Sequence, residues 1–404
     1  DHTPSDELTL EADTAARAPA APVRADWNPR GPSVRRAPLA AYDGMREHCP
    51  VALGASGAWT LFSHADVTRA ALDDRTFSNA VSRFLQVPNG LDDEEHAQFR
   101  AALDPFFGPD RMAALEDSVR DVAREAVARL PRDEPVGVIL QLGVGFAVDA
   151  MLAWLNWPAS LRDELIEWVR ENAEATRSGH LSRTAEVAQW FDDIIGRVID
   201  PRMERIEEEP RDVTDELLRL EVGGRRLERP ELISILRNWT GGDLGSLALC
   251  AGVVLHQVAA DPAIEADVRA RREDPVRLAA AIDELLRIDD PFVSNRRLAT
   301  RDTTVGTCPV TAGQRIVVDW TKANRDTQRF PDPDRYAPEE NAAANLVYGA
   351  GPHVCPGRPL ATLELRVLLE EVLDATNDLS PAQRPGVRAV RPLGGWLRTY
   401  IVLS

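Results

Sequence analysis

Cysteine is scarce in this chain of 404 residues, which contains four: Cys49, Cys250, Cys308 and Cys355. They lie far apart and show no Cys-x-x-Cys spacing, so the sequence predicts neither a disulfide framework nor a cysteine-ligated iron–sulfur cluster. Such usage is typical of a protein from a reducing compartment. We therefore expect the protein to be cytoplasmic.

Long apolar runs and an excess of positive charge are absent as well. No stretch of 18 consecutive apolar residues occurs, so we expect no membrane-spanning segment. Lys and Arg number 47 against 65 Asp and Glu, which gives a net charge of −18 at pH 7. This balance provides no general attraction for nucleic acid or an anionic membrane, and we expect neither as a partner.

The chain shows no internal repeat and no linker that would divide it. Residues 1–26 are rich in Ala and Pro with scattered acids, and they lack the basic and apolar regions of a signal peptide. We interpret 1–26 as a flexible N-terminal arm and 27–404 as a single domain. Hydrophobic residues at 44% and charged residues at 28% are ordinary for a globular protein.

The most informative stretch is NLVYGAGPHVCPGR at 345–358, followed by a helix-like apolar pattern at 359–374. Cys355 therefore lies just before a helix N-terminus, where the helix dipole and free amide groups favour a thiolate over a thiol. A thiolate in such a loop is a good iron ligand. Three glycines allow tight turns and close approach of the backbone to something large and flat: Gly349, Gly351 and Gly357.

Two other interpretations of this stretch are weaker. His353 and Cys355 could form half of a zinc site, but zinc needs three or four protein ligands and no second cluster is near. A Gly-rich turn before a helix could instead bind a phosphate, but no Lys-Ser/Thr follows it.

The stretch resembles the haem-binding loop of the cytochrome P-450 superfamily, Phe-Gly-x-Gly-x-(His/Arg)-x-Cys-x-Gly, with Tyr348 in place of the usual Phe. The resemblance implies haem b as cofactor, Cys355 as the axial ligand of its iron and His353 as a partner for a haem propionate. Gly349 and Gly357 would also contact the haem. It further implies a single-domain fold that is mainly α with small β-sheets.

Two more segments resemble the family's propionate-binding positions. In DDEEHAQFR at 92–100, His96 and Arg100 are four residues apart and share one face of a helix. Taken alone, such a pair is usually a solvated surface feature. The resemblance implies that both bind propionates, since an arginine with an imidazole can hold carboxylates through charge-assisted hydrogen bonds. Arg297 matches the second propionate arginine of the family.

Residues 231–260 form the second centre of interest, a predicted helix about 45 Å long. Glycine costs on the order of 1 kcal/mol in a helix interior relative to alanine, so Gly241, Gly242 and Gly245 predict a packing or ligand reason. The segment resembles the family's distal helix, (Ala/Gly)-Gly-x-(Asp/Glu)-Thr. However, Asp243 comes one place early and no Thr follows it directly.

Asp243 and Ser246 are three residues apart and can share a helix face as an acid–alcohol pair. We interpret them, with Gly242, as the catalytic residues that deliver protons. Two alternatives stay open for Ser246: it could bond back to a helix carbonyl as a packing hydroxyl, and ordered water could carry the proton instead.

Glu284 and Arg287 form a Glu-x-x-Arg pair in a helix expected over 276–287, a pattern that alone carries little information. The resemblance implies a structural triad of these two residues with Arg335. The non-periodic loop 77–90 and the segments near 292 and 394–396 are expected to shape the substrate pocket. The candidate pocket residues are Phe84, Val87, Phe292, Val293 and Trp396.

The resemblance implies a monooxygenase that inserts one oxygen atom of O2 into a small apolar or aromatic substrate, by hydroxylation or oxidative O-dealkylation. The chain has no plant-type iron–sulfur motif and no Gly-x-Gly-x-x-Gly loop, so electrons must come from an NAD(P)H-dependent reductase. Segments 77–83 and 238–242 resemble the bacterial self-sufficient group, in which a reductase with FMN and an iron–sulfur centre follows the haem domain. The electron donor is either such a reductase, fused in the full-length protein, or a separate ferredoxin.

Two alternative functions are retained. The first is a peroxygenase driven by hydrogen peroxide, which the displaced acid and the missing Thr favour. The second is a non-catalytic haem sensor or electron carrier.

Overall fold

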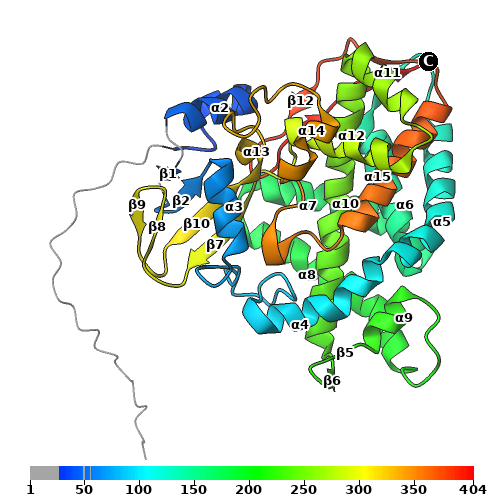
Figure 1. Cartoon of the computed structure of the whole chain (residues 1–404). Coiled ribbons are helices and arrows are strands. Elements are labelled where there is room, and N and C mark those ends of the chain that lie inside the picture. Colours follow the sequence, from blue (N-terminus) through cyan, green and yellow to red (C-terminus); the bar gives the residue numbers. More distant parts are fainter. Residues whose placement is uncertain (1–26, 49–50, 55) are drawn as a thin grey trace, which may run out of the picture.

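The computed structural model describes residues 27–404 except 49–50 and 55, so the predicted arm at 1–26 and Cys49 lie outside the described residues. Helices dominate, and the strands within 51–61 and 294–319 lie at one side of the molecule (Figure 1), which confirms the predicted mainly α fold with small β-sheets. The helices are α1 (Pro32–Arg36), α2 (Pro38–His48), α3 (His64–Leu72), α4 (Asp93–Leu103), α5 (Pro109–Ala128), α6 (Val144–Leu155), α7 (Arg162–Ser178), α8 (Leu181–Met203), α9 (Val213–Leu218), α10 (Arg229–Ala260), α11 (Pro262–Ala270), α12 (Pro275–Ile288), α13 (Trp320–Ala323), α14 (Pro338–Asn341) and α15 (Arg358–Asp374).

The largest sheet has the strand order β1-β2-β10-β7-β3, in which β10 pairs in parallel with β2 and antiparallel with β7. Its strands are β1 (Val51–Leu53), β2 (Trp59–Leu61), β10 (Arg315–Asp319), β7 (Ser294–Ala299) and β3 (Phe77–Ser78). A three-stranded sheet consists of β11 (Leu379–Pro381), β14 (Tyr400–Leu403) and β4 (Pro135–Gly137). The remaining strands form pairs: β5 (Glu221–Val222) with β6 (Arg225–Arg226), β8 (Thr303–Val305) with β9 (Cys308–Val310), and β12 (Val387–Arg388) with β13 (Trp396–Arg398).

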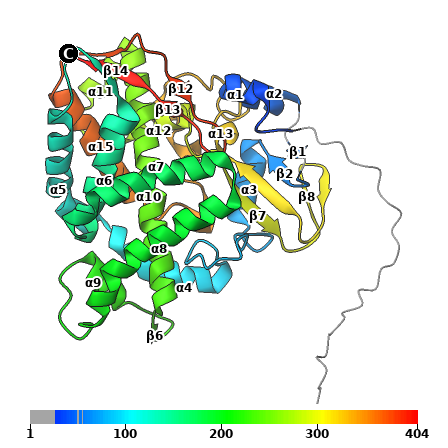
Figure 2. The ribbon, with the colours of Figure 1, turned by 180° about the vertical axis from the view of Figure 1, so that it is seen from behind.

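Helix α10 runs through the middle of the helical region, with α5, α6 and α15 on one side and the large sheet on the other (Figures 1 and 2). It starts after a capping box of Glu228 and Glu231, with Pro230 in the first turn, where a missing N–H costs nothing. It ends at Asp261, whose side chain caps the next helix. The predicted helix at 231–260 is thus confirmed, with a start two residues earlier.

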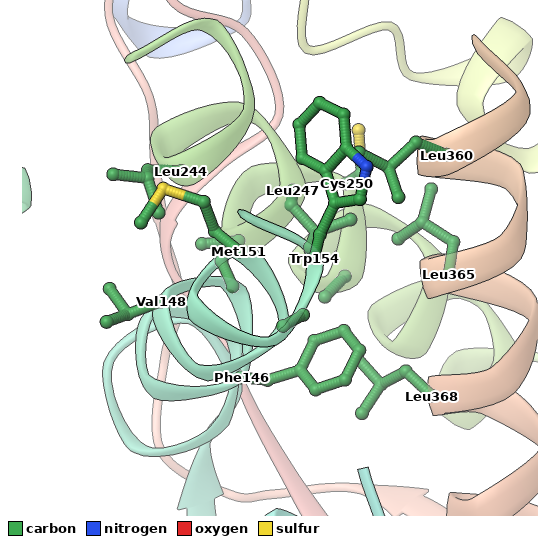
Figure 3. Packing of buried hydrophobic residues seen from close by; sticks show 14 of the residues in the cluster. Phe146, Val148, Met151, Trp154, Leu244, Leu247, Cys250, Leu360, Leu365 and Leu368 are labelled. Carbon is green, nitrogen blue, oxygen red and sulfur yellow. The ribbon is translucent and has the colours of Figure 1, made fainter. Parts of the chain in front are cut away.

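The main hydrophobic core lies where α6, α10 and α15 meet. Figure 3 shows side chains of α6, among them Met151 and Trp154, between those of α10 and α15. Gly143, just before α6, permits close approach to α10, because a Cβ there would lie 2.9 Å from the Cα of Ala248. Burial of each large apolar side chain contributes about 1.5–3 kcal/mol, so this junction holds α10 firmly in place.

Two segments are long and apolar enough to cross a membrane by length and composition, Val138–Leu155 and Arg229–Ala260. Within their most apolar windows, 72% and 67% of the residues are buried inside the protein. This burial is the behaviour of core helices, in which apolar residues on all sides contact other protein elements.

Glu284 and Arg287 form a fully buried ion pair at the end of α12, with two hydrogen bonds of 2.8 and 2.9 Å. Arg287 also donates to the carbonyl oxygen of Asn324 at 2.8 Å. Glu284 accepts from the backbone N–H of Ala337 at 3.0 Å and from Asn341 Nδ2 at 2.7 Å. Both charges are therefore satisfied, which a buried pair requires.

The predicted third member of this triad is wrong. The side chain of Arg335 lies on the surface, 56% exposed, and pairs with Glu340 at 2.6 Å. Its carbonyl oxygen accepts a hydrogen bond from Arg287 at 3.3 Å. Because Asn341 and a backbone N–H already bind Glu284, a second buried cation is not needed there.

Candidate active site

A cavity of about 410 Å³ lies beside α10 and the loop that carries Cys355. Most of the predicted site residues border it, although they come from distant parts of the sequence. They are Arg100, Gly242, Asp243, Ser246, Phe292, Val293, Arg297, Gly349, His353, Cys355 and Gly357. The structure therefore brings these residues together around one space, and His96, which does not border the cavity, stacks against His353, which does.

The Cys355 loop is held in a tight conformation before α15. Gly349 and Gly351 have φ of 75° and 73°, in the left-handed region that favours glycine. A Cβ on Gly351 would lie 2.4 Å from the carbonyl oxygen of Ala71 in α3, so this position has no room for a side chain. The N–H of Cys355 donates to the carbonyl oxygen of Tyr348 at 2.9 Å, which closes the turn.

Burial raises the pKa of the Cys355 thiol, although the backbone N–H groups of Gly357 and Arg358 hydrogen-bond to the sulfur and lower it. The amide groups at the start of α15 thus favour the thiolate, as predicted, and burial opposes them. A metal cation bound to the sulfur would deprotonate it.

Positively chargeable groups gather at another part of the cavity. The rings of His96 and His353 stack with centroids 3.8 Å apart. Burial, followed by the neighbouring His353 and Arg100, lowers the pKa of His96 to about 4. His353 Nε2 is buried and hydrogen-bonds to none of the described residues, the nearest carboxylate oxygen being that of Asp92 at 3.5 Å.

Arg297 is 6% exposed and borders the same cavity. Among the described residues it forms no ion pair, and it donates one hydrogen bond, to the carbonyl oxygen of Arg296 at 2.9 Å. Burial lowers its pKa to about 10. A buried guanidinium without a carboxylate is costly, so this part of the cavity is suited to an anionic group.

These observations test whether the site fits a haem. A sulfur ligand borders the cavity, apolar side chains such as Phe107, Leu247 and Leu360 line it, and an unpaired Arg297 and an unbonded His353 nitrogen are suited to carboxylates. An iron porphyrin with two propionates has these complementary features, so the residues present fit the cofactor.

The ligand atoms of Asp74, His96 and His353 lie within 4.8 Å of one another and could also hold a metal ion. The structure thus supplies partners for His353 that the sequence spacing did not reveal. Cys355 is not part of this group, so the cluster does not form the zinc site considered from the His-x-Cys spacing.

Arg100 borders the cavity but is already engaged with protein groups. Its Nε pairs with Asp104 at 2.7 Å, and one of its terminal nitrogens donates to the carbonyl oxygens of Pro352 and Val354 at 3.0 and 2.9 Å. Arg100 therefore fastens the Cys355 loop to α4.

On α10, Gly242, Asp243 and Ser246 all border the cavity, as one helix face requires. Burial raises the pKa of Asp243 to about 7, while a hydrogen bond from Glu364 lowers it. The hydroxyl that bonds back to a carbonyl in this helix is that of Thr240, to Leu236 at 2.6 Å.

Glu364 is the residue that sequence reasoning missed. It lies on α15, is 0% exposed, and faces Asp243 across the packed helices. Its signal in the sequence was an acid four residues after Leu360 and four before Leu368, on the buried face of an apolar helix.

Two predicted pocket residues from the loop 77–90 are wrong. The side chain of Phe84 is 62% exposed and lies outside the cavity. Val87 is buried in the core instead, because its N–H donates to Ser234 Oγ and its carbonyl oxygen accepts from Asn238 Nδ2, both at 2.8 Å. The next residues of the loop, Pro88 and Asn89, border the cavity.

Trp396 is also outside the cavity. Its ring packs against that of His256 with centroids 4.2 Å apart, and the guanidinium of Arg388 lies 4.6 Å from the ring centroid. The C-terminal region contributes Pro392 and Leu393 to the cavity wall instead. Phe292 and Val293 border the cavity as predicted.

Comparison with known proteins agrees with this geometry. Residues 272–377 match the family model for cytochrome P-450. The cyclomarin C epoxidase CymV of Salinispora arenicola is 30% identical over 348 residues, which cover 82% of this chain and 86% of that protein. The erythromycin C-12 hydroxylase of Saccharopolyspora erythraea is 28% identical over 347 residues, which cover 81% and 84% of the two chains.

The solved structure of open cytochrome P-450 EryK from S. erythraea has a TM-score of 0.81 and 26% identity, with coverage of 94% of this chain and 98% of that chain. These relatives are matched over most of their own length. They do not support the expected likeness to the fused haem, FMN and iron–sulfur group. The chain belongs to the cytochrome P-450 superfamily, whose members carry haem b, and it is a haem monooxygenase.

Proposed function

We propose that the protein inserts one atom of O2 into a small apolar or aromatic substrate, by hydroxylation or oxidative O-dealkylation. The observation that carries this proposal is that Cys355 and the buried acid Asp243 border one cavity. Apolar side chains such as Phe107, Leu247 and Phe292 line that cavity, which favours an apolar or aromatic substrate. The epoxidase and hydroxylase activities named for its relatives are oxygen insertions of the same kind.

In this proposal the chain holds the haem at two places. Cys355 would supply the sulfur that binds the iron, and this sulfur accepts hydrogen bonds from the backbone N–H groups of Gly357 and Arg358. His96, His353 and Arg297 bind the propionates, because the last two have unused donors beside the cavity. When bound, thiolate-ligated haem supplies the activation of O2 for attack on C–H bonds.

In this proposal Asp243 supplies protons to the cavity, where O2 would bind. Ser246 or a water molecule carries them onward from Asp243. A general acid works best when its pKa is close to the working pH, and burial raises the pKa of Asp243 to about 7. Apolar neighbours such as Leu103, Phe107 and Val293 exclude water and position the substrate.

The electrons are proposed to come from an NAD(P)H-dependent reductase in the cytoplasm, with an FMN and iron–sulfur protein or a separate ferredoxin as donor. The scarcity of cysteine and the lack of a dinucleotide loop support a donor outside this haem domain. The acidic net charge of −18 supports the absence of nucleic acid and membrane partners.

A peroxygenase activity is the second candidate. The observation that favours it is that Asp243 stands one place earlier than the acid of the family motif and that no Thr follows it directly. Proton delivery for O2 activation depends on that acid–alcohol pair, whereas hydrogen peroxide brings its own protons.

The two candidates are separated by isotope labelling. The purified haem protein is incubated with alkylbenzenes and alkoxybenzenes that shift its haem absorption band. Reactions contain either NAD(P)H, a ferredoxin–reductase pair and ¹⁸O2, or hydrogen peroxide alone. Label in the hydroxylated alkylbenzene, or O2-dependent formation of the phenol from the alkoxybenzene, supports the monooxygenase in the first reaction. Product with peroxide and none with O2 supports the peroxygenase, and absence of product in both overturns the substrate class.

A further inference from the structure

The mechanism proposed above uses Asp243 but leaves Glu364 unexplained. Glu364 is 0% exposed in the interior of α15, and Asp243 lies in the middle of α10, which packs against α15. An ionised carboxylate in such a place costs far more than one on the surface unless a donor or a cation reaches it. The surroundings of the pair therefore decide its protonation.

No cation reaches these two acids within the described part of the chain. Both oxygens of Glu364 and Oδ2 of Asp243 are buried and accept no hydrogen bond from a donor group there. The nearby arginines are engaged with other acids. Arg366 bonds to Glu116 and Glu370, and Arg120 bonds to the same two acids and to Glu371.

The other titratable groups around the pair are thiols, Cys250 on α10 and Cys355 in the loop. The charge of Asp243 raises the pKa of each after the larger effect of burial. Neither thiol can neutralise a carboxylate, so the two acids have to satisfy each other.

A hydrogen bond from one acid in its neutral form to the other satisfies both buried carboxyl groups. Burial raises the pKa of both acids, to about 7 for Asp243 and well above its usual value for Glu364. Asp243 borders the cavity and Glu364 does not, so Glu364 is the more enclosed acid and is the protonated donor, with Asp243 as the acceptor. Two carboxyl groups in a dry space do not both ionise.

We propose that Glu364 is a positioning residue for proton delivery: as a neutral carboxylic acid it donates a hydrogen bond to Asp243, and the two acids work as one unit between α10 and α15. When Asp243 gives its proton to the cavity, the pair changes from neutral to a single anion. The hydrogen bond from Glu364 stabilises the carboxylate left on Asp243. A proton returning from the cavity restores the neutral pair, so Glu364 keeps its own proton throughout.

The inference rests on the proposed role of Asp243, so its test has one measurement that needs no turnover. Infrared difference spectra of the haem-loaded ferric protein are recorded above pH 8, where we expect Glu364 to be neutral and Asp243 ionised. Glu364→Gln should remove a neutral-carboxyl C=O band that Asp243→Asn retains. Glu370→Gln is the matched control, because Glu370 is equally buried on α15 but paired with Arg120 and Arg366. If Glu364→Gln retains every neutral-carboxyl band of the unmodified protein, the proposal is overturned.

Kinetics then test the positioning role. Glu364→Gln keeps an N–H donor for Asp243, whereas Glu364→Leu fills similar space without one. We expect Glu364→Leu to lower turnover on the order of tenfold and to move the alkaline limb of its pH profile upward, since ionised Asp243 loses its donor. Glu364→Gln should restore both to near the starting values. Equal turnover and equal profiles in the two variants would overturn the proposal, whereas absence of turnover in the unmodified protein would refute the proposed function alone.

Discussion

His96 and His353 stack face to face, with ring centroids 3.8 Å apart and ring planes 25° apart. One ring comes from α4 and the other from the loop before α15, so folding assembles this part of the site. Because burial lowers the pKa of His96 to about 4, that imidazole is neutral at physiological pH. The lasting positive charges on this cavity are those of Arg100, which is engaged by Asp104 and backbone carbonyls, and of Arg297.

Arg297→Met should weaken haem retention. A hydrogen bond to a charged group contributes about 1.5–3 kcal/mol, so we expect haem to leave roughly 10–100 times faster. The same change should stabilise the haem-free protein, because it removes a buried charge that has no partner there. Transfer of haem to an acceptor globin measures the rate. Arg296→Met, at the exposed neighbouring position on β7, is the control, and equal rates in the two variants would refute the assignment.

Cys355→His should abolish the red-shifted absorption band that the reduced protein forms with carbon monoxide, since resemblance to thiolate-ligated haem proteins implies that band. The control is Cys250→Ser, because Cys250 also borders the cavity. It should keep the band. A normal band in the Cys355 variant would place the iron ligand at another residue.

The raised pKa of Asp243 predicts an effect on stability. Its pKa rises from 3.8 to about 7 on folding, so folded protein binds more protons than unfolded protein between those values. The contribution of Asp243 to the stability of the folded protein is fully present below about pH 4 and is lost as the pH rises to about 7. Asp243→Asn should therefore show a flatter decline of Tm across this range.

Thermal unfolding of the haem-loaded protein at pH 5 and pH 8 measures this difference. Asp200→Asn is the control. The hydrogen bond from Arg229 lowers the pKa of Asp200, so the contribution of Asp200 to stability changes only at lower pH. If Asp243→Asn and the unmodified protein lose the same Tm between the two pH values, Asp243 does not titrate as described.

Asp243→Asn should also slow O2-dependent turnover while leaving haem content unchanged, because the acid moves protons and does not ligate the iron. Ser246→Ala should cost less turnover and release more hydrogen peroxide per NAD(P)H consumed. Product, peroxide and NAD(P)H are quantified in the same reactions. Unchanged peroxide release in Ser246→Ala would assign the proton transfer to water.

Pro356 has no N–H, so the donors to the Cys355 sulfur come from Gly357 and Arg358. Pro356→Ala supplies one more N–H and should raise the reduction potential of the iron, because hydrogen bonds to a ligating sulfur raise it. A neutral hydrogen bond contributes about 0.5–1.5 kcal/mol, equivalent to tens of millivolts. Redox titration with and without substrate measures the change. No rise in either state would leave Pro356 with the role of stiffening the turn.

The features predicted correctly from the sequence depend on neighbouring residues. The predicted helix at 231–260 follows from an apolar pattern within one continuous segment, and α10 begins two residues earlier, at Arg229. The Cys355 loop is a contiguous motif, and the cavity gathers its members as the resemblance implied. Sequence patterns of this length contain the information that determines such elements.

The predictions that were wrong concern side chains whose positions depend on partners distant in sequence. Phe84 and Trp396 are large apolar residues in suitable loops, but whether a loop residue enters a cavity depends on how its backbone is anchored, as Val87 is to Ser234. Asn341, and not the predicted Arg335 side chain, hydrogen-bonds to Glu284, and no charge pattern in the sequence indicates this partner. Glu364 gained its importance from Asp243 on another helix.

The contact between Gly351 and Ala71 has a consequence for protein engineering. A Cβ at Gly351 would lie 2.4 Å from the Ala71 carbonyl oxygen, so the shape of the Cys355 loop is fixed partly by the end of α3. Loops exchanged between related proteins should therefore be moved together with the matching α3. In a chimera that receives the loop alone, the loop and α3 come from different proteins, so the close contact between their backbones is not matched.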